Sequence, residues 1–209
     1  MLKNFISFLC VTMLLFLSAC SGITTVKNAQ IHTPLDSKLT TIRVLYQVNN
    51  LSSTTPNAKT GTKDIAYTGY DDLPKILSER VPLVFELNHI SAIYEQTNNA
   101  FFTLQTGSKN KAWNESKAPI LDFQAMNGHE SFNNYGGSVV INMPIRLHDA
   151  LDKNTYWDGS LENIVYYGGF GLSGHIDAKY VDNMLKVLLQ QMAKDNIIYL
   201  PNNVAKLPL

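Results

Sequence analysis

Cysteine is almost absent from this chain. It has 209 residues but only two cysteines, Cys10 and Cys20, and both lie within the first twenty positions. Residues 21–209 therefore contain no thiol, which excludes a disulfide framework, a cysteine nucleophile and a cysteine metal site from that part of the chain. A body folded from these residues must be held together by non-covalent packing.

An excess of charge of either sign is also lacking, because lysine plus arginine number 17 and aspartate plus glutamate number 17. Without residues 1–19, which contain Lys3 and no acidic residue, the chain has 16 basic and 17 acidic residues and a formal charge of −1. A nucleic-acid partner usually requires a basic patch or a high isoelectric point, so we expect none. The 45% hydrophobic content indicates a folded globular domain.

Long hydrophobic runs are missing as well. The most apolar stretch, Phe5–Leu17, is shorter than the roughly 20 apolar residues that a membrane-spanning helix needs. It follows Lys3 and has the length of the apolar core of a signal peptide. It ends in Leu17-Ser18-Ala19-Cys20. This ending resembles the lipobox of bacterial lipoproteins, in which a leucine and two small residues precede an acylated cysteine.

The resemblance to lipoproteins implies a specific maturation of this chain. Residues 1–19 would be the signal peptide, and Cys20 would become the first residue, carrying a diacylglycerol on its thiol and a fatty acid such as palmitate on its amino group. Ser21, in place of an aspartate, resembles the pattern that is sorted to the outer membrane, where the protein would face the periplasm. An ordinary secretory signal or an uncleaved N-terminal anchor is the alternative.

The first half of the remaining chain predicts a tether, a strand and a helix. Residues 20–39 are polar and contain Pro34, which is typical of a flexible tether. Alternating apolar residues at 41–48 predict a strand. The acidic pair before Leu73-Pro74 predicts a helix start, and Pro82 predicts a break in that helix.

The second half predicts a short strand at 91–95 and further strands at 119–126, 137–147 and 155–165. The last two would form an antiparallel hairpin, and Pro144 indicates an edge position or a bulge. Apolar spacing over 176–194 predicts an amphipathic helix.

Together these elements predict one α/β or α+β domain at residues 40–200, followed by a tail at 201–209. Its mixed, largely antiparallel sheet would carry two main amphipathic helices on one face. With Tyr156-Trp157-Asp158-Gly159 in its meander of strands, this body loosely resembles the small α/β lipoproteins that assist envelope transport and assembly.

A glycine-rich loop joins the last predicted strand to the last helix. Gly169, Gly171 and Gly174 match the G-x-G-x-x-G pattern of dinucleotide-binding turns. No second strand follows to complete a dinucleotide-binding unit, so we expect no cofactor. We predict instead that Gly168, Gly169, Phe170, Gly171 and Gly174 form a loop that contacts a partner, because binding residues are often placed on loops.

Two sets of polar residues are weak candidates for chemistry. Ser173, His175 and the more distant Ser138 are candidates for a serine-hydrolase site. No G-x-S-x-G elbow surrounds Ser173, however. A metal site could be assembled only from residues without a recognised ligand spacing: His129, Glu130, His148, Asp149, Asp152 and Asp158. The three aspartates are better interpreted as turn residues, so we expect no metal.

Two functions follow from these features. The favoured one is a non-enzymatic, lipid-anchored envelope lipoprotein that acts as an accessory or assembly component by binding another envelope protein or a second copy of itself. The alternative is a lipid-anchored hydrolase or a binder of an envelope polymer. The two differ in whether Ser173, a histidine and a carboxylate meet in a cleft.

The lipoprotein prediction is tested by the substitution Cys20→Ala. Removing the thiol removes the attachment point of the lipid, so fatty-acid labelling should be abolished and the protein released or misprocessed. Metabolic labelling combined with envelope fractionation measures both effects. Continued membrane association with unchanged processing would contradict the prediction.

Overall fold

A computed structural model describes most of the chain beyond its N-terminal segment. The described residues are 23–47, 62–63, 72–97, 111–124, 126–133, 136–151, 153–168 and 177–208, and only the backbone is described at 62–63, 127–133, 136–139 and 165–168.

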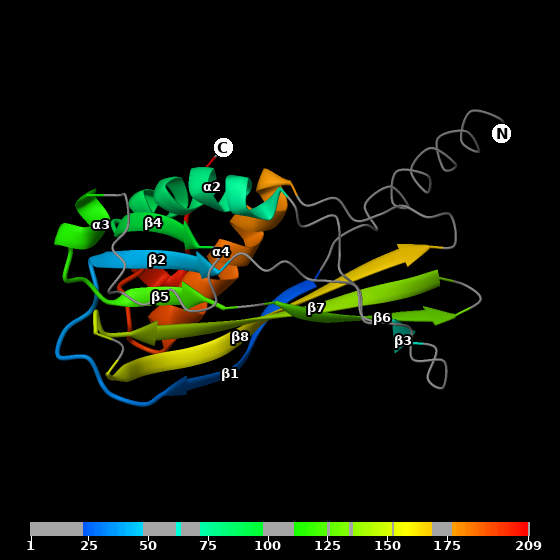
Figure 1. The fold of residues 1–209 in the computed structure, drawn as a ribbon, viewed down its shortest axis with the longest axis horizontal. Coiled ribbons are helices and arrows are strands. Elements are labelled where there is room, and N and C mark those ends of the chain that lie inside the picture. Colours follow the sequence, from blue (N-terminus) through cyan, green and yellow to red (C-terminus); the bar gives the residue numbers. More distant parts are fainter. Residues whose placement is uncertain are drawn as a thin grey trace, which may run out of the picture.

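The described strands form one mixed sheet (Figure 1). They are β1 (Ile23–Ile31), β2 (Thr41–Gln47), β3 (Thr62–Lys63), β4 (Ser91–Thr97), β5 (Ile120–Phe123), β6 (Asn127–Asn133), β7 (Gly136–His148) and β8 (Thr155–Gly168). The main order is β1-β8-β7-β5-β2-β4, while β6 pairs with β7 and β3. Among the described strands, only β2 makes parallel pairs, with β4 and β5. The predicted mixed, largely antiparallel sheet is confirmed, as is the hairpin of β7 and β8.

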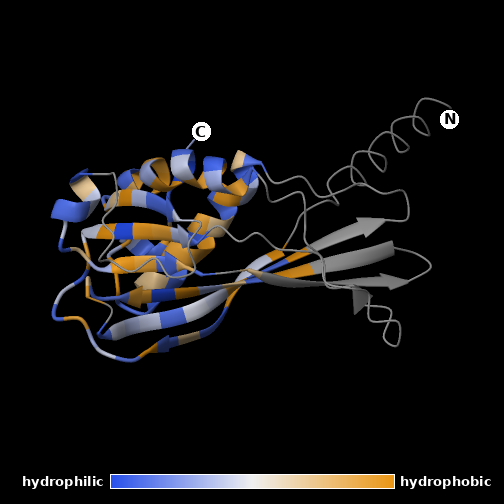
Figure 2. Ribbon diagram, viewed as in Figure 1, coloured by the Kyte–Doolittle hydropathy of each residue, from blue (hydrophilic) through white to orange (hydrophobic). Residues whose placement is uncertain are grey.

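Two long helices pack against each other and against this sheet. They are α2 (Leu73–Leu87) and α4 (Ala178–Lys194), and shorter helices occur at α3 (Lys111–Glu115) and η2 (Pro201–Asn203). α2 contacts β4 and α4, and α4 contacts β1. Apolar residues concentrate where these helices meet the sheet (Figure 2). The prediction of two main amphipathic helices is therefore confirmed.

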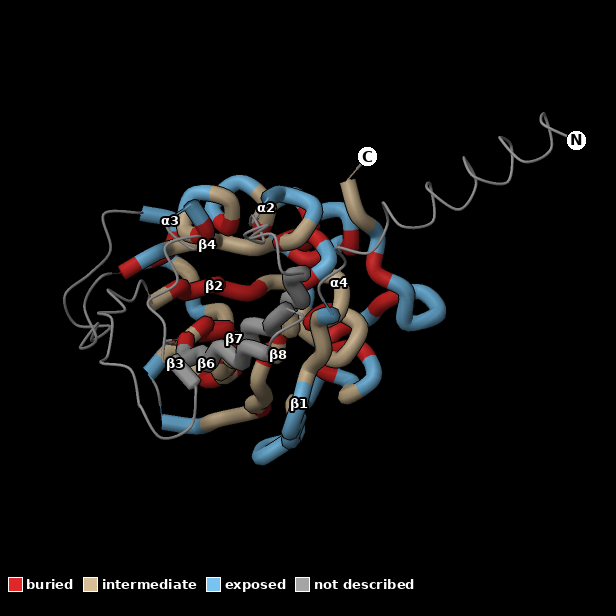
Figure 3. Tube along the Cα trace, turned by 90° about the vertical axis from the view of Figure 1, so that its right-hand side faces the viewer, coloured by how far each residue is buried: buried red, intermediate tan, exposed pale blue. Residues whose placement is uncertain are grey.

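The buried centre of this arrangement is β2. Its alternate residues Ile42, Val44 and Tyr46 pack in the core that the helices cover, as the sequence pattern predicts. Arg43 and Leu45 occupy the opposite face and are also buried. Figure 3 shows β2 as buried and much of β1 as exposed. Burial on both faces is the usual environment of strands in parallel pairs.

The predicted break in α2 at Pro82 is wrong, because the helix continues to Leu87. A proline inside a helix costs about 3 kcal/mol, since it removes one hydrogen bond and crowds the preceding turn. The next turn buries Val84 and Phe85 completely. Burying one such side chain contributes about 1.5–3 kcal/mol, so the two together offset the cost of Pro82. The predicted start at Leu73 is confirmed, but the Asp72 side chain makes no capping hydrogen bond.

Pro144 lies inside the sheet at an irregularity rather than at an edge. β5 pairs Phe123 with Ile145, and β6 resumes by pairing Asn127 with Asn142. The pairing along this side of β7 is therefore interrupted between Asn142 and Ile145. Pro144, which has no N–H to donate, falls at this interruption, and the edge interpretation is wrong because β8 pairs with β7 at the same level.

The predicted flexible tether is wrong over most of its length. Residues Ile23–Ile31 form the edge strand β1, paired with β8 from Ile164 to Trp157. Leu39 then makes a bridge with Ile198. The exposed, polar residues of β1 give it little hydrophobic alternation. Its stability comes from backbone hydrogen bonds to β8, which a sequence pattern does not reveal.

The predicted tail is also part of the domain. Asn88, at the end of α2, donates its side-chain N–H to the carbonyl of Lys206 at 2.9 Å and accepts the Lys206 backbone N–H at 2.8 Å. Ala205 is buried against the main core. These paired hydrogen bonds fix the C-terminal residues to α2.

The helix α4 begins and packs as predicted. Asp177 caps its N-terminus by accepting the backbone N–H of Tyr180 at 2.7 Å. Its buried face includes Val181, Met184, Leu185, Leu188 and Met192. A charged pair fastens it to α2, since Arg80 donates Nε and Nη2 to the two carboxylate oxygens of Asp182 at 2.7 and 2.5 Å.

Removing this pair should weaken the contact between the helices. We expect Asp182→Ala to lower the free energy of unfolding by about 2 kcal/mol, because the mostly buried Arg80 loses a two-pronged, charged hydrogen-bond partner. Chemical denaturation measures the change. The control Glu86→Ala, at an exposed position of α2, should change stability by less than about 0.5 kcal/mol. Equal effects of the two substitutions would contradict a special role for the pair.

Candidate functional site

Several residues singled out by sequence lie outside the described residues. They are Cys20, Gly169, Phe170, Gly171, Ser173, Gly174, His175 and Asp152. Gly168 is described, as the last residue of β8. The predicted partner-contact loop and the serine-hydrolase candidate therefore stay predictions.

The remaining polar candidates are separated into different environments. Asp149 accepts the backbone N–H groups of Leu151 and Lys153 at 3.0 and 2.8 Å, which confirms that it is a turn residue. Asp158 is not a turn residue, because it lies within β8 and its carboxylate is 2.8 Å from Nε2 of His32. His148 is buried and its Nδ1 is 2.9 Å from the Asp149 carbonyl.

The described residues form neither a metal cluster nor a membrane-spanning helix. Within those ranges, no group of three or more histidine, cysteine, aspartate or glutamate side chains is arranged to hold a metal ion. Of the helices formed by the described residues, none has both the length and the hydrophobicity to cross a bilayer.

A row of charged residues crosses the face of the sheet opposite α2 and α4. In register, Asp122 on β5 lies opposite Arg146 on β7, and Arg146 lies opposite Asp158 on β8. Directly opposed residues have Cβ atoms about 4.5–5.5 Å apart, so the alternating charges favour this register. Gln47 joins the row by donating Nε2 to both carboxylate oxygens of Asp122, at 3.0 and 2.9 Å.

Burial dominates the electrostatics of this row. Asp122 is only 3% exposed, and burial raises the pKa of its carboxyl group. The hydrogen bond from Gln47 and the charges of His148 and Arg146 act in the opposite direction without cancelling that effect. The row therefore holds a carboxylate that is harder to ionise than an ordinary aspartate.

Arg43 occupies the same face beside this row. Its Nε donates to the Ala118 carbonyl at 2.9 Å, and its guanidinium lies 5.1 Å from the centre of the Trp113 ring. Burial lowers the pKa of Arg43. Stacking of a guanidinium on an indole partly compensates for its lost hydration, so this arrangement is primarily structural.

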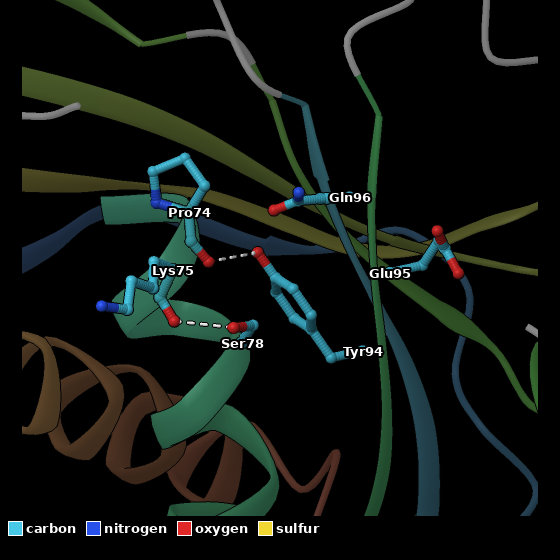
Figure 4. Close-up of a pocket in the computed structure, with 6 residues that line it drawn as sticks. All are labelled: Pro74, Lys75, Ser78, Tyr94, Glu95 and Gln96. Atoms are coloured by element: carbon cyan, nitrogen blue, oxygen red, sulfur yellow. Dashed lines mark hydrogen bonds between the residues drawn. The ribbon is translucent and has the colours of Figure 1, made fainter. Parts of the chain in front are cut away.

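A groove lies at the edge of the sheet, between α2 and β4 (Figure 4). This groove has a volume of about 500 Å³ and is lined by Pro74, Lys75 and Ser78 of α2 and by Tyr94, Glu95 and Gln96 of β4. The Tyr94 hydroxyl donates to the Pro74 carbonyl at 3.2 Å and so joins the two walls. Burial raises the pKa of Tyr94, with Tyr46 and Glu95 adding to the effect, so its hydroxyl stays neutral.

The groove combines apolar walls with hydrogen-bonding groups. The rings of Pro74 and Tyr94 are half-buried, whereas Lys75, Ser78 and Gln96 are exposed. Glu95 also lines the groove, but its side chain points away from α2 (Figure 4). This lining suits a segment that offers an apolar side chain together with polar or acidic groups.

The backbone of β4 adds a second means of binding. Ser91 donates its N–H to the Thr40 carbonyl on the β2 side. Because backbone groups alternate sides along a strand, those of Ala92, Tyr94 and Gln96 are directed away from β2. In the part of the chain that the structure describes, no strand pairs with this outer side of β4. An unpaired strand edge is a template for an additional strand.

No sequence pattern distinguishes the groove residues. The only available signal was the strand predicted at 91–95, and nothing in the sequence placed Lys75 or Ser78 beside it. Comparison with known proteins adds no assignment, because neither the protein-family models nor the curated proteins include a match to this chain. The function must therefore be argued from the chain's own features.

The buried carboxyl group of Asp122 predicts a pH dependence of stability. Because the folded-state pKa of Asp122 is raised, this group adds to the free energy of unfolding at pH values below its unfolded-state pKa near 4. That contribution is lost as pH rises through the folded-state pKa. We expect Asp122→Asn to reduce this loss between pH 4 and pH 7.

Asp149 provides a control of opposite sign. Partial burial raises its pKa, but hydrogen bonds led by the Lys153 backbone N–H outweigh that effect and lower it overall. Asp149→Asn should therefore remove stability that is present above pH 4. Denaturation of both variants from pH 3 to 8 measures the two trends, and parallel curves for the variants would contradict them.

Proposed function

We propose that this chain is a non-enzymatic, lipid-anchored component of the bacterial cell envelope that binds another envelope protein. The anchor is Cys20, supported by the Leu17-Ser18-Ala19 sequence before it. Ser21 supports sorting to the outer membrane, with the body facing the periplasm. The partner would bind the groove between α2 and β4.

The observation that carries the binding proposal is the combination of this groove with the outer edge of β4. An extended peptide can add a strand to an open edge, gaining affinity from backbone hydrogen bonds and specificity from a neighbouring pocket. Ala92, Tyr94 and Gln96 supply the backbone groups, and the groove supplies the pocket. The partner segment is expected to be extended, with an apolar residue against Pro74 and Tyr94.

Electrostatics refine the expected segment. Lys75 is the charged residue whose side chain borders the groove from α2, whereas Glu95 points to the other face (Figure 4). An acidic or hydroxyl-bearing residue near Lys75 would gain a charge-assisted hydrogen bond. We therefore expect a neutral or acidic segment to bind more tightly than a basic one.

Site-specific photocrosslinking in cells tests this proposal. A photoreactive amino acid at Gln96 should give a discrete adduct with one envelope protein. Ser78→Trp should reduce that adduct at least tenfold, because the indole fills the groove. Glu86→Trp, the same change at an exposed position elsewhere on α2, should leave the adduct unchanged.

Three results would contradict the proposal. These are an adduct unaffected by Ser78→Trp, an equal loss with Glu86→Trp, and a protease-resistant adduct. The last would favour an envelope polymer as the ligand.

A further inference from the structure

Part of the sheet projects beyond the end of β1. The first residue of β1, Ile23, pairs with Ile164 of β8. Ile164 in turn pairs with Val140 of β7. The hairpin continues past this level through Gly136–Val140 and Ile164–Gly168, with β6 alongside. We call these two segments the arm. Figure 1 shows β6, β7 and β8 extending away from the helices.

The arm projects from the end of the sheet at which β1 begins. β1 is antiparallel to β8, so the chain runs from Ile31 toward Ile23 in the direction in which β8 runs toward Gly168. Cys20 is three residues before Ile23, so the two lie within about 10 Å of each other in any conformation. Along β8, Gly168 lies about 14 Å beyond Ile164. The arm thus extends as far from Ile23 as Cys20 can reach.

Charge is distributed unevenly along this hairpin. The ten residues of the arm include no aspartate, glutamate, lysine or arginine, but they include Tyr166 and Tyr167. The rest of β7 and β8 contains Arg146, Asp158 and Glu162. On β6, Glu130 is paired in register with Lys63 of β3, so opposite charges oppose each other there.

We propose that the arm contacts the lipid surface in which Cys20 is anchored. The inference rests on the proposed acylation of Cys20. An acylated Cys20 holds the bilayer within about 10 Å of Ile23, whereas the arm extends about 14 Å beyond the level of Ile23. Tyrosine is enriched at membrane–water interfaces, which suits Tyr166 and Tyr167. Ile23, half exposed at the base of the arm, adds apolar surface on the same side.

The charge pattern also selects the orientation. A sideways approach would press β1 against the headgroups over its full length, including the Lys27–Glu162 ion pair. An end-on approach places the uncharged residues of the arm at the interface, and the charges described beside them, Glu130 and Lys63, are opposite each other in register, so it removes fewer unpaired charges from water. The body would then stand with the β7–β8 turn, including the exposed Leu151, farthest from the membrane.

Spin labelling of the full-length, acylated protein in phosphatidylethanolamine–phosphatidylglycerol vesicles tests this arrangement. Residues 21–209 contain no cysteine, so a single introduced thiol is labelled selectively. Ser138→Cys places the nitroxide on the arm, and Leu151→Cys places it at the opposite end of the same hairpin. Ser131→Cys, whose position pairs in register with Ser138, is a second arm label if the first variant folds poorly.

The arm label should be several-fold more accessible to oxygen, relative to a water-soluble nickel complex, than the label at Leu151. Equal accessibility in protein that carries the lipid would overturn the membrane contact while leaving the anchor intact. The same shielding in unacylated Cys20→Ala protein without vesicles would also overturn it, because protein would then cover the arm. If the mass of the protein shows no lipid, the proposed anchor fails and this inference fails with it.

Discussion

The antiparallel pairing of β7 with β8 is the interaction on which the rest of the structure depends. β8 holds β1 on one side, and β7 holds β5 and β6 on the other. β5 then positions β2, and β2 positions β4. The inward residues of this series form the surface that α2 and α4 cover. The groove and the arm therefore both take their positions from one hairpin.

Sequence patterns predicted the elements whose burial is one-sided or strictly alternating. Val44 in β2, Ile145 in β7 and Leu188 in α4 each follow such a pattern and are buried as expected. Patterns failed where partners distant in sequence decide the outcome. β1 is exposed and is stabilised by its pairing with β8. The helix α2 continues beyond Pro82 because Phe85 must be buried. The C-terminal residues are held by hydrogen bonds to Asn88.

The candidate groove could not be predicted for a related reason. It forms where Lys75 and Ser78, near the start of α2, face Tyr94 and Gln96 on a strand that follows that helix. Each residue is ordinary in its own segment, and only the packing of α2 beside an edge strand brings them together. The charged row is similar, because Asp122, Arg146 and Asp158 meet only through strand register.

The direct entry of the chain into β1 has a mechanical consequence. If Cys20 is anchored as proposed, any force between membrane and body acts on Ile23 and pulls β1 along its own axis. The hydrogen bonds to β8 are perpendicular to that axis, so they bear the load together rather than one after another. The edge strand would then resist shear, and tension at the membrane would pass directly into the central hairpin.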